Sequence, residues 1–186
     1  MANLTDSEIR AATKAAIVAG STSCGDRVFV SRMTPNGTVD GAGQPLVDLF
    51  PFALVYILKE SKRAISMSRS EFNVTTTVAV EVHALVPAGT ALDDDALDAA
   101  LDPLKIEIED ALLASDWSDL MDLGSVETTI RLAGKGDTRE VLALLTFSGE
   151  HYKTYFRALP DTPLDTIGGT VQIPTAADLS IPVDLT

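Results

Sequence analysis

The stretch from Phe72 to Val86 constrains the fold more than any other part of the chain, because apolar and polar residues alternate along it. Successive side chains of a strand point to opposite faces of a sheet, so the alternation predicts one long strand. One face should lie on a core and carries Val74, Thr76, Val78, Val80, Val82, Ala84 and Val86. The other face should be wet or lie at an interface and carries Asn73, Thr75, Thr77, Glu81 and His83.

Further strands are predicted on both sides of this one. An apolar run from Phe50 to Leu58 has the length of a strand, and the basic and polar stretch Lys59 to Ser70 can extend it into a hairpin with the long strand. Another strand is expected over Arg27 to Met33. Two more alternating segments follow later in the chain, at residues 124–133 and 139–148.

An acidic helix is predicted after the long strand. The triplet Asp93 to Asp95 places negative charge where the helix dipole favours it, and an amphipathic stripe then runs from Leu97 to Leu112. Pro103 falls inside this stripe. Either the helix bends there, or Asp102 caps a second helix with Pro103 at its first position.

The order of elements predicts an α+β domain. A capping box of Thr5 and Glu8 begins an alanine-rich helix that ends near Gly20, so the order is helix, strands, helix, strands. Hairpin-like connections favour a mostly antiparallel sheet of about four to five strands with helices packed on one face. Prolines then punctuate the end of the chain, which predicts one domain over residues 1–158 and an extended C-terminal arm over residues 159–186.

Composition excludes several classes of protein. Residues 93–122 carry eleven acidic residues against Lys105 alone, so this segment holds most of the net charge of -13. Phosphate binding needs clustered Lys and Arg, which argues against a tight sequence-specific DNA reader. No apolar run approaches the ~20 residues that span a bilayer. Cys24 is the one cysteine and has no partner for an intrachain disulfide. We therefore expect a soluble protein that folds in a reducing cytoplasm.

No set of catalytic or metal-ligating residues is recognisable in the sequence. His83 and His151 show no metal-ligand spacing with Cys24 or with each other, so both are expected to be ordinary surface histidines. Cys24 lies in a Ser/Thr/Gly segment that would suit a nucleophile, but a plain small residue in a loop is the simpler interpretation. We expect no catalytic residue, no metal and no cofactor.

Two charged clusters are the candidate interface residues. The basic cluster can meet an acidic partner or can form a solvated hairpin tip, and it comprises Lys59, Lys62, Arg63 and Arg69. The acidic cluster can meet a basic partner or can be the solvated start of a helix, and it comprises Asp93, Asp94, Asp95 and Asp98.

Two short motifs and the order of elements carry a resemblance. A Phe-Pro-x-Ala-x-Val-Tyr strand start spans Phe50 to Tyr56, and a Val-Pro-Ala turn at residues 86–88 precedes the acidic segment Leu92 to Asp98. Together they resemble the minor tail protein U family, the tail terminators of long-tailed bacteriophages. The resemblance covers roughly residues 5 to 155. The family usually ends near the last strand, so the arm at residues 159–186 is a departure from it.

The resemblance implies a small α+β subunit that forms a hexameric ring and has no catalytic activity. The ring would cap the finished tail tube, end its polymerisation and present a surface for joining the head. The implied partners are further copies of the chain, the tail tube protein and the head–tail connector or neck protein. DNA would pass through the ring without specific binding. The protein would lie at the head-proximal end of the virion tail after assembly in the host cytoplasm.

Two alternatives stay open. Another neck or tail-completion protein would also act at the head–tail junction, but it would join tail to head without setting tail length. A small soluble enzyme or ligand-binding α+β domain would instead require a polar pocket whose residues the sequence does not reveal.

Overall fold

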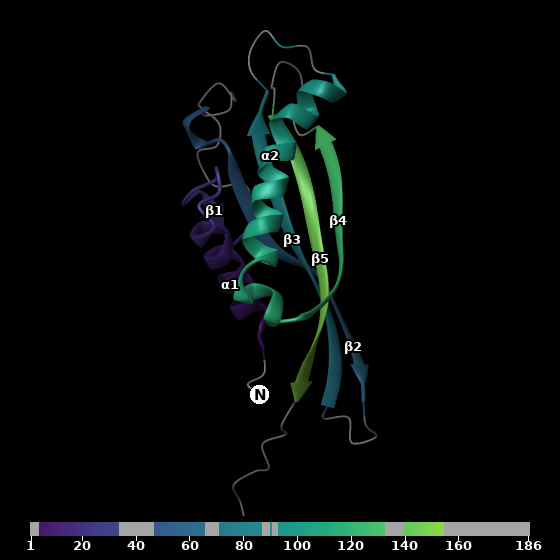
Figure 1. The fold of residues 1–186 in the computed structure, drawn as a ribbon. Helices are drawn as coiled ribbons and strands as arrows, with labels where there is room; N and C mark the ends of the chain where they lie inside the picture. Colours follow the sequence, from purple (N-terminus) through teal and green to yellow (C-terminus); the bar gives the residue numbers. More distant parts are fainter. Residues whose placement is uncertain are drawn as a thin grey trace, which may run out of the picture. The chain divides into compact units, whose positions relative to one another are not determined.

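The computed structural model describes residues 4–33, 47–65, 71–86, 90, 93–132 and 140–154. Within these ranges a five-stranded sheet carries two α-helices on one face, so the predicted α+β class is confirmed (Figure 1). The expected arm at residues 159–186 and its boundary lie outside the described residues, and so does Arg69.

The sheet is open and mostly antiparallel, as predicted. Its strand order is β1-β2-β3-β5-β4. The strands are β1 (Val28–Phe29), β2 (Phe52–Ala64), β3 (Glu71–Leu85), β4 (Asp122–Leu132) and β5 (Glu140–Thr154). Among these strands the short pair β1–β2 is parallel. The hairpin β2–β3 and the pairs β3–β5 and β4–β5 are all antiparallel.

The long alternating segment forms β3, the central strand. Val78, Val80 and Val82 lie in the core beneath the helices, as the alternation predicts. The opposite face is not uniformly wet, however. Ala79 and His83 on that face are almost fully buried, together with the β2 residues Phe52 and Leu54. For the half of β3 nearest its C-terminus the expectation of a wet face is therefore wrong, and the alternative of an interface stays a prediction.

The basic stretch extends β2 as far as Ala64 and pairs it with β3 in the predicted hairpin. A bulge at Leu58 shifts the register between Ile57 and Lys59. Because faces alternate along a strand, Lys59 and Arg63 lie on the face away from the helices, and Lys62 lies on the helix side.

Two strand lengths differ from the prediction. The strand expected over Arg27 to Met33 is reduced to the two residues of β1, and Val30 beyond it is exposed. By contrast, β5 continues past Ser148 to Thr154 because it pairs with the whole length of β3. His151 therefore lies inside a strand rather than after one.

Helix α1 (Asp6–Ala19) begins with the predicted capping box, in which Thr5 and Glu8 bond each other's backbone amides, and it ends at Gly20. Helix α2 (Asp94–Leu113) is one continuous helix with Pro103 inside it, which decides between the two predicted arrangements. Figure 1 shows that α2 bends along its length, as an internal proline causes. The buried side of α1 carries Ile9, Thr13 and Ile17, and Ala12 and Ala16 are partly buried against the core.

Gly149 on β5 allows the connection before β4 to pack closely. A Cβ at this position would stand 2.8 Å from the Met121 Cβ and 3.1 Å from the Asp122 carbonyl oxygen. We expect Gly149→Ala to lower the free energy of unfolding by about 2 kcal/mol, because backbone must move to admit the methyl group. Urea denaturation followed by circular dichroism measures this.

The matched control is Gly124→Ala on the neighbouring strand. A Cβ there would stand 3.7 Å from the Ser148 carbonyl oxygen, which is ordinary van der Waals contact. We expect this variant to be neutral or slightly stabilising, because alanine restricts the unfolded chain. Equal losses in the two variants would show that the close approach at Gly149 is not the cause.

Candidate functional site

The acidic cluster occupies the first turns of α2. Asp93 is the N-cap residue, and its carboxylate accepts a hydrogen bond of 3.0 Å from the Ala96 amide. Asp94, Asp95 and Asp98 follow it, and all four aspartates are exposed. The structure thus brings the four predicted acidic residues together in one surface, here named the acidic helix start.

The predicted basic cluster does not form a single surface. Lys62 makes an ion pair of 2.6 Å with Glu60, and Lys153 approaches the same carboxylate at 3.7 Å. The hydrogen bond from Lys62 is the main reason why the pKa of Glu60 is lowered. Lys62 is therefore neutralised within the subunit, whereas Lys59 and Arg63 lie exposed on the other face.

An exposed isoleucine accompanies these two cations. Ile65 follows directly after β2, and 51% of its surface is accessible. Its amide bonds the Glu71 carbonyl oxygen at 3.0 Å, which fixes the backbone at this point of the hairpin. Lys59, Arg63 and Ile65 are here named the basic hairpin end.

The acidic helix start and the basic hairpin end lie at opposite ends of the sheet (Figure 1). Ala64 pairs with Phe72 near the beginning of β3, and α2 begins after β3 has ended at Leu85. At the rise of an extended strand, these points are about 40 Å apart. One subunit therefore presents opposite charges at its two ends.

An apolar groove adjoins the acidic helix start. Its volume is about 580 Å³, and it lies between the first half of α2 and the end of β3. Ala96, Ala99 and Ala100 line the helix side, where their small side chains leave the space open. Ala84 and Val86 line the strand side. Sequence reasoning missed this groove, although alanines at helical spacing beside a charged helix start were its signal.

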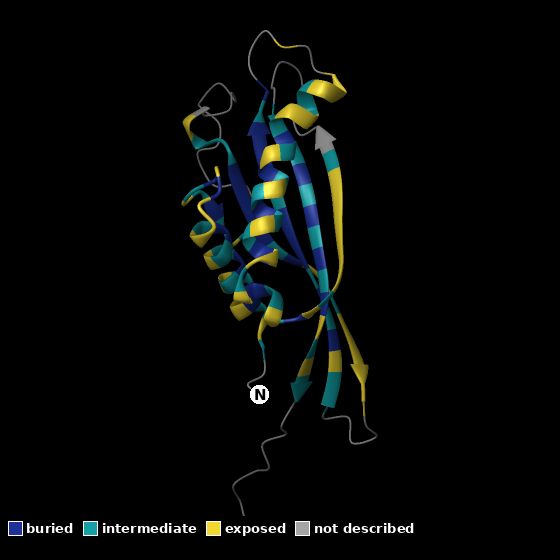
Figure 2. Cartoon of the chain, in the orientation of Figure 1, coloured by how far each residue is buried: buried dark blue, intermediate teal, exposed yellow. Residues whose placement is uncertain are grey.

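Strand β4 is a second exposed feature. It lies last in the strand order, and its residues from Gly124 to Thr129 are exposed on both faces (Figure 2). Its outer edge has no partner strand within the described ranges, so backbone amides and carbonyls are open to pairing. Such an edge suits main-chain pairing with another protein segment.

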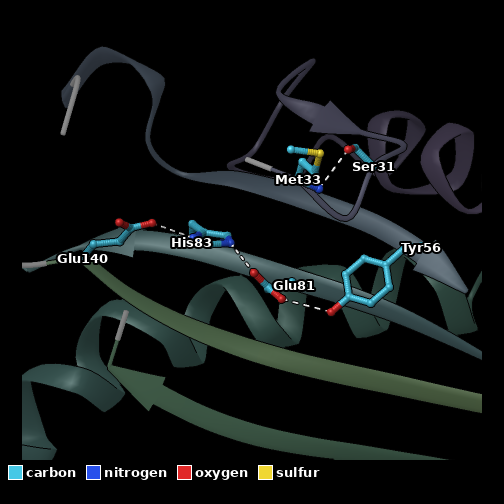
Figure 3. Close-up of polar contacts among 6 residues, drawn as sticks. All are labelled: Ser31, Met33, Tyr56, Glu81, His83 and Glu140. Atoms are coloured by element: carbon cyan, nitrogen blue, oxygen red, sulfur yellow. Dashed lines mark hydrogen bonds and ion pairs between the residues drawn. The ribbon is translucent and has the colours of Figure 1, made fainter. Parts of the chain in front are cut away.

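A partly buried polar network crosses the sheet face away from the helices (Figure 3). The ring nitrogens of His83 lie 2.8 Å from Glu81 Oε1 and 2.7 Å from Glu140 Oε1. The Tyr56 hydroxyl donates to Glu81 Oε2 at 3.0 Å. Phe52 stacks on the His83 ring, with centroids 4.4 Å apart and planes 9° from parallel. This packing makes the predicted surface histidine a buried one, which corrects the expectation for His83.

The network favours the protonated, cationic form of His83. Burial by itself lowers the pKa of the ring, but the hydrogen bonds that the ring donates to Glu140 and Glu81 and the charges of both carboxylates raise it above its ordinary value. Both nitrogens donate to carboxylates in that state, so neither is open to take a proton from a substrate. The geometry suits a structural cation that holds two carboxylates and three strands together.

The other candidate reactive groups are also enclosed. Burial raises the pKa of the Cys24 thiol to about 12, so it carries no thiolate at neutral pH. His151 has a pKa that is lowered by burial and then by the charge of Lys153. Across the described ranges, no three His, Cys, Asp or Glu side chains are grouped to hold a metal ion. No helix in the described part of the chain has the length and apolar character to cross a bilayer.

Comparison with known proteins adds no family to this picture. Neither a protein-family model nor a curated protein sequence matches the chain at a significant level.

Proposed function

We propose that this chain is a structural virion subunit, a tail terminator whose ring caps the tail tube of a long-tailed phage. The ring ends tube polymerisation and provides the surface to which the head joins. Support comes first from the fold, because a helix, a hairpin, an acidic helix and two closing strands follow one another as the family resemblance implies. The protein acts by binding rather than by catalysis.

The observation that carries the proposal is the separation of opposite charges. The acidic helix start and the basic hairpin end lie at the two ends of one subunit (Figure 1). A ring of identical subunits needs two different, complementary surfaces, because each copy meets its neighbours head to tail. A symmetric dimer would instead need one self-complementary surface.

The overall charge is compatible with DNA passage. At a net charge of -13 the chain offers few groups to neutralise phosphates. DNA can then move through the ring without being retained. The exposed edge strand β4 supplies a further surface for the tail tube protein or for the connector.

Deleting the gene from a phage that carries it tests the proposal. We expect tails of uncontrolled length, because nothing would end tube growth, and electron microscopy of lysates measures the length distribution. Wild-type protein supplied from a plasmid should restore a single tail length. This complementation is the control for effects on neighbouring genes.

Tails of normal length without heads would contradict the terminator role. That result would assign the chain to the neck or tail-completion proteins. If the deletion mutant produced infectious particles of normal shape, the protein would not be needed for virion assembly. That result would favour an enzyme or a ligand-binding domain.

A further inference from the structure

The apolar groove is built to receive side chains from outside its own subunit. Its helix wall consists of three alanines followed by Pro103 and Leu104, whereas Leu101, Ile108 and Leu112 of α2 are buried in the core. The groove therefore exposes apolar surface that nothing in α2 covers. Burying such surface against a partner is favourable in proportion to its area.

The carboxylates beside the groove favour a positively charged partner. Asp94, Asp95 and Asp98 stand on the same two turns of α2 as the lining alanines, and Asp93 caps that helix. The positive end of the helix dipole offsets only about half a charge of these carboxylates. A partner that combines an apolar side chain with cations fits this arrangement.

The basic hairpin end has that combination. Ile65 is half exposed, and Lys59 and Arg63 are exposed on the same hairpin. Because Lys62 already pairs with Glu60, the two cations that remain are Lys59 and Arg63 among the described residues of β2.

One subunit cannot join its own two surfaces. At the rise of an extended strand, the end of the hairpin lies about 40 Å from the end of β3, and Lys59, which lies opposite Thr77, is about 26 Å from it. We propose that the basic hairpin end of one copy docks in the apolar groove of the next copy, with Ile65 in the groove and Lys59 and Arg63 against the acidic helix start. This contact is head to tail, so its repetition closes a ring or extends a filament. The inference rests on the proposed ring and assigns its subunit contact.

Exchanging charges between the two surfaces tests the contact. One variant carries Lys59→Glu and Arg63→Glu, a second carries Asp94→Lys and Asp98→Lys, and a third carries all four changes. We expect each of the first two to self-associate at least about tenfold more weakly, because like charges then face each other. The third should regain association, because its reversed hairpin meets a reversed groove. Sedimentation velocity and native mass spectrometry of the purified full chain measure this.

Apolar variants test the groove itself. Ile65→Ser should weaken association, and Ala99→Trp should block the groove. The matched control is Ile106→Ser, because Ile106 is 58% exposed on α2 but does not line the groove. The charge control is Glu109→Lys with Asp110→Lys, which changes the net charge as much as the groove variant does. Circular dichroism checks that every variant is folded.

Several outcomes would overturn the contact. One-sided charge variants that associate like the wild type would do so, and so would a fourfold variant that fails to recover. A wild-type chain that stays monomeric but binds the apolar dye ANS, with Ala99→Trp abolishing binding, would assign the groove to a small apolar ligand. Tail length in the deletion mutant separates this from the proposed function. If the fourfold variant recovers association but the deletion mutant makes tails of normal length, the proposed function is overturned and the contact stands.

Discussion

Replacing His83 by glutamine should lower the free energy of unfolding by about 3 kcal/mol at pH 6, the magnitude typical of breaking a buried ion pair. Glutamine carries no charge and can donate to only one of the two carboxylates in this geometry. Glu81 and Glu140, whose side chains are 23% and 19% exposed, would then repel each other without a cation between them. Urea denaturation of the wild type and the variant measures the difference.

The same network predicts a loss of stability at alkaline pH. The folded pKa of His83 is raised above its unfolded value of about 6.5. Its contribution is therefore fully present below that unfolded value and disappears as the pH rises through the folded pKa. The wild type should lose stability across this window, and the glutamine variant should lose less. Unfolding curves at a series of pH values from about 5 to 9 test this.

The matched control is His151→Gln on β5. Neither ring nitrogen of His151 has a hydrogen-bond partner in the described part of the chain, and its pKa is lowered rather than raised. This variant should keep the alkaline loss of stability that His83 causes. If His83→Gln and the wild type show the same pH dependence, the histidine is not the cation of the network.

Local signals in the sequence predicted the parts of the fold that depend on short segments. The Thr5–Glu8 capping box, the hairpin of β2 and β3, and the acidic start of α2 are confirmed, because each rests on residues a few positions apart. Alternation also identified the core face of β3. These features follow from local backbone geometry and the period of two in a strand.

Features set by distant packing were not predictable in the same way. His83 alternates with core residues and was therefore predicted to lie on the wet face, but Phe52 stacks on its ring and the side chain is almost fully buried. The length of β5 is fixed by its pairing with β3, not by its own pattern past Gly149. Neither the burial of His83 nor the length of β5 can be predicted from the residues of the strand concerned alone.

The candidate interface was predicted in part. The four aspartates gather in one place because a helix start collects them. The basic cluster is split between the two faces of β2, because side chains alternate along the strand and the bulge at Leu58 shifts this alternation. Lys62 therefore lies on the same face as Glu60 and pairs with it. The number of charged residues in a segment does not show on which face of the sheet each side chain lies. The apolar groove depends on the distance between α2 and β3, which the sequence does not give either.

Replacing Trp117 by alanine should cost about 4 kcal/mol of unfolding free energy, among the largest losses for a single residue in this domain. Trp117 lies in the short helical turn η2 (Asp116–Asp119) and packs edge-on against Phe147, with ring centroids 5.5 Å apart. Its indole Nε1 donates to Thr13 Oγ1 at 2.8 Å, and that hydroxyl donates to the Ile9 carbonyl oxygen at 2.7 Å. The residue thus joins η2, α1 and β5, and its loss leaves a cavity among all three.

A second set of variants separates the ring from the hydrogen bond. Trp117→Phe should keep most of the packing and cost about 2 kcal/mol, and Thr13→Val should cost about 1 to 2 kcal/mol because it leaves the buried indole N–H unpaired. In the Trp117→Phe background, Thr13→Val should cost about 1 kcal/mol less, since the donor is already gone. Chemical denaturation of all four proteins gives this coupling energy. Strictly additive losses would mean that Thr13 and Trp117 stabilise the helix side independently, and that packing alone holds η2 against the sheet.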